Sequence, residues 1–173
     1  MATPSPVAIA LHSTFERDFL PLLESLGFAP TKLKNRKPAL VVASATRVLS
    51  ETRRLEATLW CDARGSNLRF RFDVVEPING VECTRQLDLE VPWPNPGYPK
   101  PATLDFSGGS FRPHESPERL ATAVTFLAGA FAASLPAFAS ELPELSSQLQ
   151  VAAASPRWKQ AVERARQLWE TRA

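Results

Sequence analysis

The sequence predicts an α+β fold with an N-terminal helix, a three- to four-stranded antiparallel meander, and C-terminal helices packed on one face of the sheet. Apolar residues near the N-terminus recur at helical spacing, residues 55–91 alternate between apolar and polar side chains, and helical spacing returns after residue 116. A chain of 173 residues with 44% hydrophobic content suits a single domain, residues 1–173. Its predicted parts are a helix at 6–26, an antiparallel sheet at 39–91, a Pro/Gly-rich crossover at 92–115 and helices at 116–172.

Serine–proline pairs mark the predicted helix starts. Serine accepts a hydrogen bond from a first-turn N–H, and proline fits the first helical position, where no donor is needed. The pairs are Ser5-Pro6, Ser116-Pro117 and Ser155-Pro156. The first helix has an alternative start at Ser13, where Glu16 completes a capping-box pattern. Pro21 is expected to kink or interrupt this helix, and Gly27 to end it.

The meander is predicted from segments with period-two alternation. They follow a segment rich in β-branched residues at 39–49, which reads as a strand with a helix as its alternative. The residues of the predicted apolar face are Leu55, Ala57, Leu59, Cys61, Leu68, Phe70, Phe72, Val74, Val81, Cys83, Leu87, Leu89 and Val91. Polar residues alternate with them, so the opposite face is expected to meet water.

Two hairpin turns set the predicted register of the sheet. Asn79-Gly80 is the preferred pair for a type I′ turn, which puts Ile78 opposite Val81. The pairs that follow are Phe72 with Leu87, Phe70 with Leu89, Leu68 with Val91, Arg71 with Asp88 and Arg69 with Glu90. Apolar and charged pairs agree in this register, and a one-residue slip would break both.

The earlier hairpin allows two loop lengths. A two-residue Gly65-Ser66 loop puts Arg71 opposite Trp60. A four-residue loop puts Asp73 opposite Glu56, and two like charges facing each other are unfavourable. The shorter loop is therefore the predicted one.

The C-terminal third is predicted to be helical, with breaks at Pro136 and Pro143. The last helix carries Trp158 and Trp169 on one apolar face. Such a face either anchors a partner or covers the protein's own core, and the second interpretation is favoured.

The stretch VPWPNPGYPKPATLDF, residues 91–106, contains a PxxP pattern around Tyr98. Polyproline segments dock into aromatic grooves of partner proteins. Proline also cannot donate to a strand ladder, so the same residues can end the sheet and stiffen the crossover to the helices. The second interpretation is favoured.

Motifs that carry chemistry are missing from the sequence. His12 and Glu16 are four residues apart, which suits a helical side-chain contact better than half of a metal site. His114 lies in a predicted loop before a helix start. Cys61 and Cys83 fall on the apolar face of the meander, where they could lie close together as small hydrophobic residues. The sequence therefore predicts no catalytic residue, no metal and no cofactor, and a protein that is not an enzyme.

Basic residues are concentrated in one part of a chain whose net charge is only +2. From Lys32 to Arg54 there are seven basic residues and one acid. The predicted partner-binding residues are Lys32, Lys34, Arg36, Lys37, Trp60, Arg69, Arg71 and Tyr98. One protein partner is the leading prediction. An anionic ligand or nucleic acid at 32–54 is the alternative, which the acids on the same sheet face disfavour. The third hypothesis is an enzyme with an unrecognised site near His114 and Glu115.

The N-terminus lacks the basic residues of a signal peptide, and no stretch approaches 18 apolar residues. Two cysteines are too few for a disulfide scaffold. These observations predict a cytoplasmic protein, a monomer or homodimer, with no membrane partner.

Residues 14–91 resemble the opening of small bacterial α+β domains of unknown function. The resemblance lies in the segment LPLLESLGF, which is followed by a basic loop and then an antiparallel meander. Some of those domains are immunity proteins encoded beside toxins. The resemblance implies a protein that binds one partner and has no active site. The alanine-rich C-terminal third departs from the family's pattern.

Overall fold

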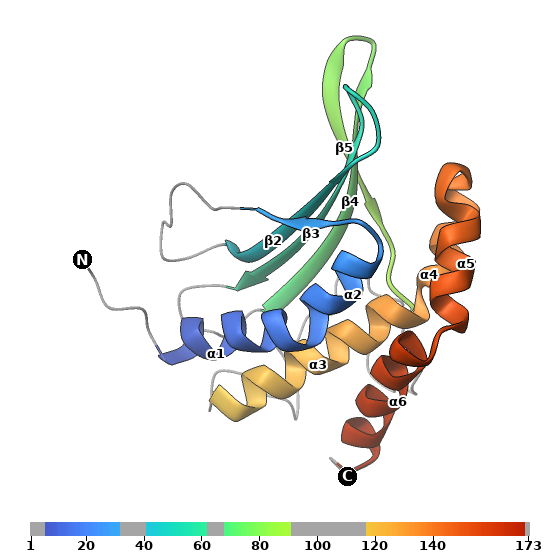
Figure 1. The fold of residues 1–173 in the computed structure, drawn as a ribbon. Coiled ribbons are helices and arrows are strands. Elements are labelled where there is room, and N and C mark those ends of the chain that lie inside the picture. Colours follow the sequence, from blue (N-terminus) through green and yellow to red (C-terminus); the bar gives the residue numbers. More distant parts are fainter. Residues whose placement is uncertain (1–5, 32–40, 62–67, 91–116, 172–173) are drawn as a thin grey trace.

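In the computed structural model, a five-stranded antiparallel sheet lies against helices that cover one of its faces (Figure 1). The structure describes residues 6–31, 41–61, 68–90 and 117–171. Helices precede and follow the sheet in the chain. The predicted α+β class, with an N-terminal helix, an antiparallel sheet and C-terminal helices, is therefore confirmed.

The strands follow one another across the sheet in the order β1-β2-β3-β4-β5. Their bounds are Ala29–Pro30 (β1), Val41–Val48 (β2), Arg54–Cys61 (β3), Leu68–Ile78 (β4) and Val81–Leu87 (β5). The prediction of three to four strands was too low because β1 is only two residues long. Ala29 and Pro30 pair with Thr46 and Ala45, and so short a segment carries no alternating pattern.

The β4–β5 hairpin has the predicted register. Ile78 pairs with Val81, and Phe72 pairs with Leu87. Asn79 and Gly80 have φ angles of 53° and 79°, as a type I′ turn requires. The ladder ends at Leu87, so the predicted pairs beyond it are not part of β5.

The β3–β4 hairpin has the register that the sequence argument disfavoured. Glu56 lies opposite Asp73, so the prediction that Arg71 faces Trp60 is wrong. Each acid is compensated from its own strand, where residues two apart share a face. Arg54 donates to Glu56 at 2.6 Å, and Arg71 donates to Asp73 at 3.2 Å. The prediction had weighed only pairs across strands.

The predicted helix at 6–26 consists of three consecutive helical segments. They are α1 (Pro6–Thr14), the π-helical turn η1 (Phe15–Phe19) and α2 (Leu20–Ser25). Pro21 has no N–H to donate, so a regular helical ladder cannot continue through it. The chain instead widens into η1, in which the Leu20 N–H bonds to the Phe15 carbonyl. Gly27, with a φ angle of 80°, follows the helix end as predicted.

The C-terminal helical region is divided by its prolines. Its segments are α3 (Pro117–Ala133), α4 (Leu135–Glu141), the 3₁₀ turn η3 (Pro143–Leu145), α5 (Ser146–Ala154) and α6 (Pro156–Thr171). Pro136 and Pro143 lie in the first turns of α4 and η3, in agreement with the predicted breaks. Among the described helices, none alone is long and apolar enough to cross a membrane. Ala121–Ala133 and α4 together have the length and composition, and they are bent by 49°.

Phe131 on α3 is the centre of an aromatic cluster that joins the sheet to the helices. Its ring centroid lies 5.3 Å from that of Phe70 and 5.1 Å from that of Phe72, both on β4. On the helical side it contacts Phe19 of η1, Phe138 of α4 and Trp158 of α6. One buried side chain therefore connects every layer of the fold.

The tryptophans of α6 pack within the chain. Trp158 is 2% exposed, and its indole N–H donates to the Ser25 hydroxyl at 3.3 Å. Trp169 meets the ring of Phe126 edge-on at a centroid distance of 5.7 Å. The apolar face of α6 thus covers α3, which is the favoured one of its two interpretations.

The two cysteines lie far apart in the sheet. Cys61 pairs with Leu68, whereas Cys83 pairs with Glu76, eight residues further along β4. At a rise of about 3.4 Å per residue, this separates them by roughly 27 Å. The possibility that they lie close together is therefore wrong. Cys83 is also only half-buried.

Candidate functional site

Several predicted partner-binding residues fall outside the described part of the chain. These are Lys32, Lys34, Arg36, Lys37 and Tyr98, together with the candidate loop residues His114 and Glu115. The structure does place Trp60 opposite Arg69 on β3 and β4, and Arg71 two residues further along the same face. The three positions share the sheet face that points away from the helices, as predicted.

The described arginines of the basic region are occupied by partners within the chain. Arg47 donates to the Gln148 side chain at 2.8 Å, which ties β2 to α5. The remaining contacts are Arg47 with the Leu26 carbonyl, Arg53 with Glu76 and Glu144, and Arg54 with Glu56 and Glu82. The side chains of Arg53 and Arg54 are also only 28% and 34% exposed, so they offer little surface to phosphates, which weakens the nucleic-acid alternative.

His12 and Glu16 form the predicted contact between neighbouring helical turns. The His12 Nδ1 atom lies 3.4 Å from a Glu16 carboxylate oxygen, and the two side chains are 42% and 55% exposed. No group of three or more His, Cys, Asp or Glu side chains within the described ranges could hold a metal ion.

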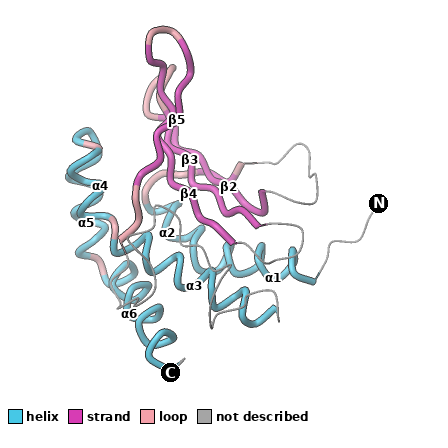
Figure 2. Tube along the Cα trace, turned by 180° about the vertical axis from the view of Figure 1, so that it is seen from behind, coloured by secondary structure: helices cyan, strands magenta, loops and turns pink. Residues whose placement is uncertain are grey.

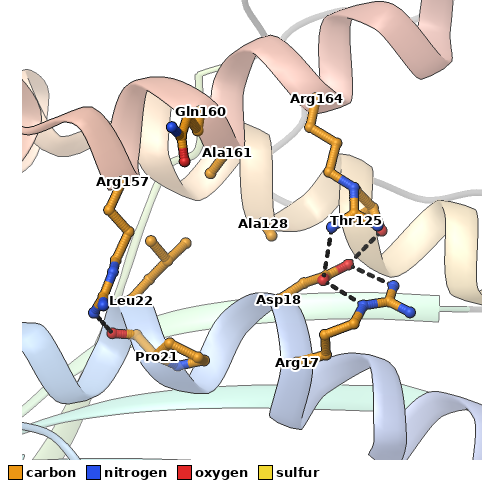
Figure 3. A pocket seen from close by; sticks show the side chains of 10 residues that line it. All are labelled: Arg17, Asp18, Pro21, Leu22, Thr125, Ala128, Arg157, Gln160, Ala161 and Arg164. Atoms are coloured by element: carbon orange, nitrogen blue, oxygen red, sulfur yellow. Dashed lines mark hydrogen bonds and ion pairs between the residues drawn. The ribbon is translucent and has the colours of Figure 1, made fainter.

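A cleft of about 290 Å³ opens between the N-terminal helical segments, α3 and α6 (Figure 3). We call it the arginine cleft. Its lining residues are Arg17, Asp18, Pro21, Leu22, Thr125, Ala128, Arg157, Gln160, Ala161 and Arg164. Arg17 and Asp18 come from η1, the turn that precedes Pro21, and π-helical turns are frequent at functional sites.

Asp18 is the only acid that lines the arginine cleft, and its side chain is 5% exposed. Arg17 donates to it through two nitrogens, at 2.7 and 2.9 Å. The Thr125 hydroxyl donates at 2.6 Å and Arg164 at 3.3 Å. Burial opposes ionisation of this carboxyl, but the bonds from Arg17 and Thr125 and the charge of Arg164 outweigh it, so the pKa of Asp18 is lowered.

A second candidate surface is the tip of the β4–β5 ribbon, residues 76–83, which we call the distal hairpin. The β3 ladder with β4 ends at Arg54 and Val75, whereas β4 and β5 continue to Ile78 and Val81. In Figure 1 the ribbon rises clear of the helices. Ile78 is 54% exposed and Val81 is 65% exposed.

The base of the distal hairpin is braced on both sides. Arg54 reaches across from β3 and donates to both Glu82 carboxylate oxygens, at 2.9 and 3.1 Å. On the opposite face, Arg53 pairs with Glu76 at 2.9 Å. The forked contact of Arg54 with Glu82 fixes orientation as well as adding energy, so it holds the tip in one direction.

Sequence reasoning missed both surfaces. Val81 was placed on the apolar face of the meander, and it is exposed because the ribbon extends past the helices that would cover it. The arginine cleft unites residues more than a hundred positions apart. Its only sequence signal is the spacing of Arg157 and Arg164, seven residues apart on one face of α6.

Comparison of the chain with protein-family models, with curated proteins and with solved structures returned no match.

Proposed function

We propose that this protein is a non-enzymatic protein-binding module that holds one partner protein through its distal hairpin. The observation that carries the proposal is the exposed pair Ile78 and Val81 at the end of a braced two-stranded ribbon. An immunity or adaptor protein works in this way, by presenting a fixed surface to a single partner.

The exposed apolar residues support this location. The large hydrophobic residues that are exposed in the described part of the chain are Ile9, Val48, Ile78, Val81 and Val151. Two of them, Ile78 and Val81, lie opposite each other on one face of the ribbon, whereas Val48 pairs with Arg54 on the other face of the sheet. A grouping of apolar side chains on a surface is typical of protein interfaces.

Rigidity supports the proposal in a second way. Association costs free energy for every side chain and loop that it orders. The distal hairpin is paired up to its two-residue turn and is clamped by Arg54 and Glu82. Figure 2 shows the two strands of this ribbon joined by a short turn. A partner with an apolar pocket for Ile78 and Val81 would therefore bind with little further ordering.

The experiment compares three forms of the purified protein as bait in extract of the source cells. The double variant Ile78→Thr/Val81→Thr keeps β-branched shape but places a hydroxyl at each apolar contact. Val151→Thr, on α5 and 73% exposed, is the matched control. Because all three sites are exposed, the free energy of unfolding of each variant should lie within about 0.5 kcal/mol of the wild-type value.

We expect wild type and Val151→Thr to retain the same protein at equal stoichiometry in high salt. The double variant should retain it at least tenfold more weakly, as measured by titrating the recovered partner against each bait. Equal retention by all three forms, or no stoichiometric protein on wild type, would contradict the proposal.

A further inference from the structure

The arginine cleft is a second site, and it does not depend on the distal hairpin. Its lining residues include three guanidinium groups, of Arg17, Arg157 and Arg164, and the single carboxylate of Asp18. The formal charge of the lining is therefore positive. A concave site with an excess of one sign of charge attracts ligands of the opposite sign.

Asp18 offsets only one of the three positive charges, and both of its oxygens are already shared. One oxygen accepts from Arg17 and Arg164, and the other accepts from Arg17 and Thr125. Its lowered pKa keeps the carboxylate ionised, so it holds the two guanidinium groups from opposite walls. Asp18 is thus a positioning residue, and the side chains of Arg17 and Arg164 stay 55% exposed.

Arg157 stands at the other end of the arginine cleft, as Figure 3 shows. Its only hydrogen bond within the described residues runs to the Pro21 carbonyl, at 3.3 Å. Arg157 therefore meets a backbone oxygen rather than a carboxylate. No acid that lines the cleft faces Arg157.

The two ends are separated by a fixed interval. Arg157 and Arg164 lie seven residues apart on α6, which corresponds to about 10 Å along the helix axis. Between them lie the apolar side chains of Leu22, Ala128 and Ala161, and the amide of Gln160. The cleft thus has a cation at each end and an apolar floor with one polar group.

We propose that the arginine cleft binds a ligand with two carboxylate or phosphate groups about 10 Å apart, joined by an uncharged linker. Arg157 takes one anionic group, and Arg164 and Arg17 take the other, with the forked geometry that guanidinium groups offer to oxyanions. Such a ligand is either a free linear dianion or an acidic peptide in polyproline II conformation, in which residues three apart lie on the same side and about 9 Å apart.

The test is calorimetric titration of the whole protein at constant ionic strength. The probes are suberate, a linear eight-carbon dicarboxylate, octanoate as its single-charge counterpart, and the blocked peptide Glu-Ala-Ala-Glu. We expect suberate or the peptide to bind at least tenfold more tightly than octanoate. Tighter binding of the peptide assigns the site to a protein segment, and tighter binding of suberate assigns it to a small molecule.

Three variants of α6 complete the test. Arg157→Gln and Arg164→Gln should each weaken binding of the dianion at least tenfold. Arg166→Gln is the matched control, because Arg166 is on the same helix, pairs with Glu163 and Glu170, and does not line the cleft. Absence of saturable binding, equal affinity for octanoate, or equal losses in all three variants would overturn the inference.

Discussion

Asp18 and Asp73 are buried to nearly the same extent, but their pKa values are shifted in opposite directions. Their side chains are 5% and 7% exposed. The pKa of Asp18 is lowered, whereas burial raises the pKa of Asp73. Burial penalises the charged form of both carboxyls, so the difference must come from the groups that surround them.

The number of donors separates the two sites. Asp18 accepts hydrogen bonds from two arginines and a threonine, and no other acid lines its cleft. Within the described residues, the hydrogen bond to Asp73 comes from Arg71 at 3.2 Å, and Asp73 lies opposite Glu56, whose charge raises its pKa further. The arginine cleft therefore stabilises the ionised form of Asp18, whereas the sheet face disfavours the ionised form of Asp73.

Removing the charge of Asp18 should have the largest effect. We expect Asp18→Asn to lower the free energy of unfolding by about 2 kcal/mol at neutral pH, because hydrogen bonds to a charged group are lost. The contribution of Asp18 is present above its unfolded-state pKa, about 3.9. It is lost as pH falls through the lower folded-state pKa. Urea unfolding from pH 2 to 7 should show this acid-dependent loss in wild type and not in the variant, and an unchanged pH profile would contradict the assignment.

Removing one donor from Asp18 should have a smaller effect. Thr125→Val keeps the shape of the buried side chain but deletes the hydroxyl that donates to the carboxylate at 2.6 Å. We expect a loss of about 1 kcal/mol and a rise in the pKa of Asp18, measured by NMR titration of its carboxyl carbon. A pKa that does not move would mean that the arginines alone set the acidity.

The corresponding change at Asp73 should have the opposite sign. Asp73→Asn removes a buried charge and its repulsion from Glu56, while the amide oxygen can still accept from Arg71. We expect the free energy of unfolding at pH 7 to be higher than that of wild type by about 0.5 kcal/mol, because a poorly compensated buried charge is removed. Because the folded-state pKa of Asp73 is raised, wild type loses stability as pH rises through that pKa. The advantage of the variant should therefore shrink in acid, and a variant less stable than wild type at pH 7 would break the comparison.

The smallest effect is expected at Glu56. Glu56→Gln removes the like charge opposite Asp73 and keeps an acceptor for Arg54. The pKa of Asp73 should fall by a fraction of a unit, with little change in stability. NMR titration of Asp73 in the two proteins measures the shift directly, and a rise would show that Glu56 does not repel it.

The two hairpins of the sheet show what the sequence could predict. The β4–β5 register followed from a local signal, the Asn79-Gly80 turn, and it is confirmed. The β3–β4 register was predicted wrongly because a facing pair of acids was judged only by its mutual repulsion. Arg54 and Arg71 compensate those acids from their own strands. Their spacing of two residues is visible in the sequence, but the prediction weighed only pairs across strands.

The arginine cleft lay beyond sequence reasoning for a different reason. Pro21 predicted a break in the first helix, but not the π-helical turn that brings Asp18 toward α6. Thr125 and Arg164 come from helices that follow the whole sheet in the chain. Only the packing of α6 on α3 brings them within hydrogen-bond distance of Asp18.

The position of Phe131 has a consequence for the nascent chain on the ribosome. The N-terminal helix and all five strands are synthesised before Phe131 and Trp158 emerge. Until then, the rings of Phe19, Phe70 and Phe72 lack their central contact, and uncovered apolar strands are prone to aggregate. The last third of the chain must therefore be synthesised before the apolar face of the sheet can be covered. Chains released before that point are expected to need protection by chaperones or to be degraded.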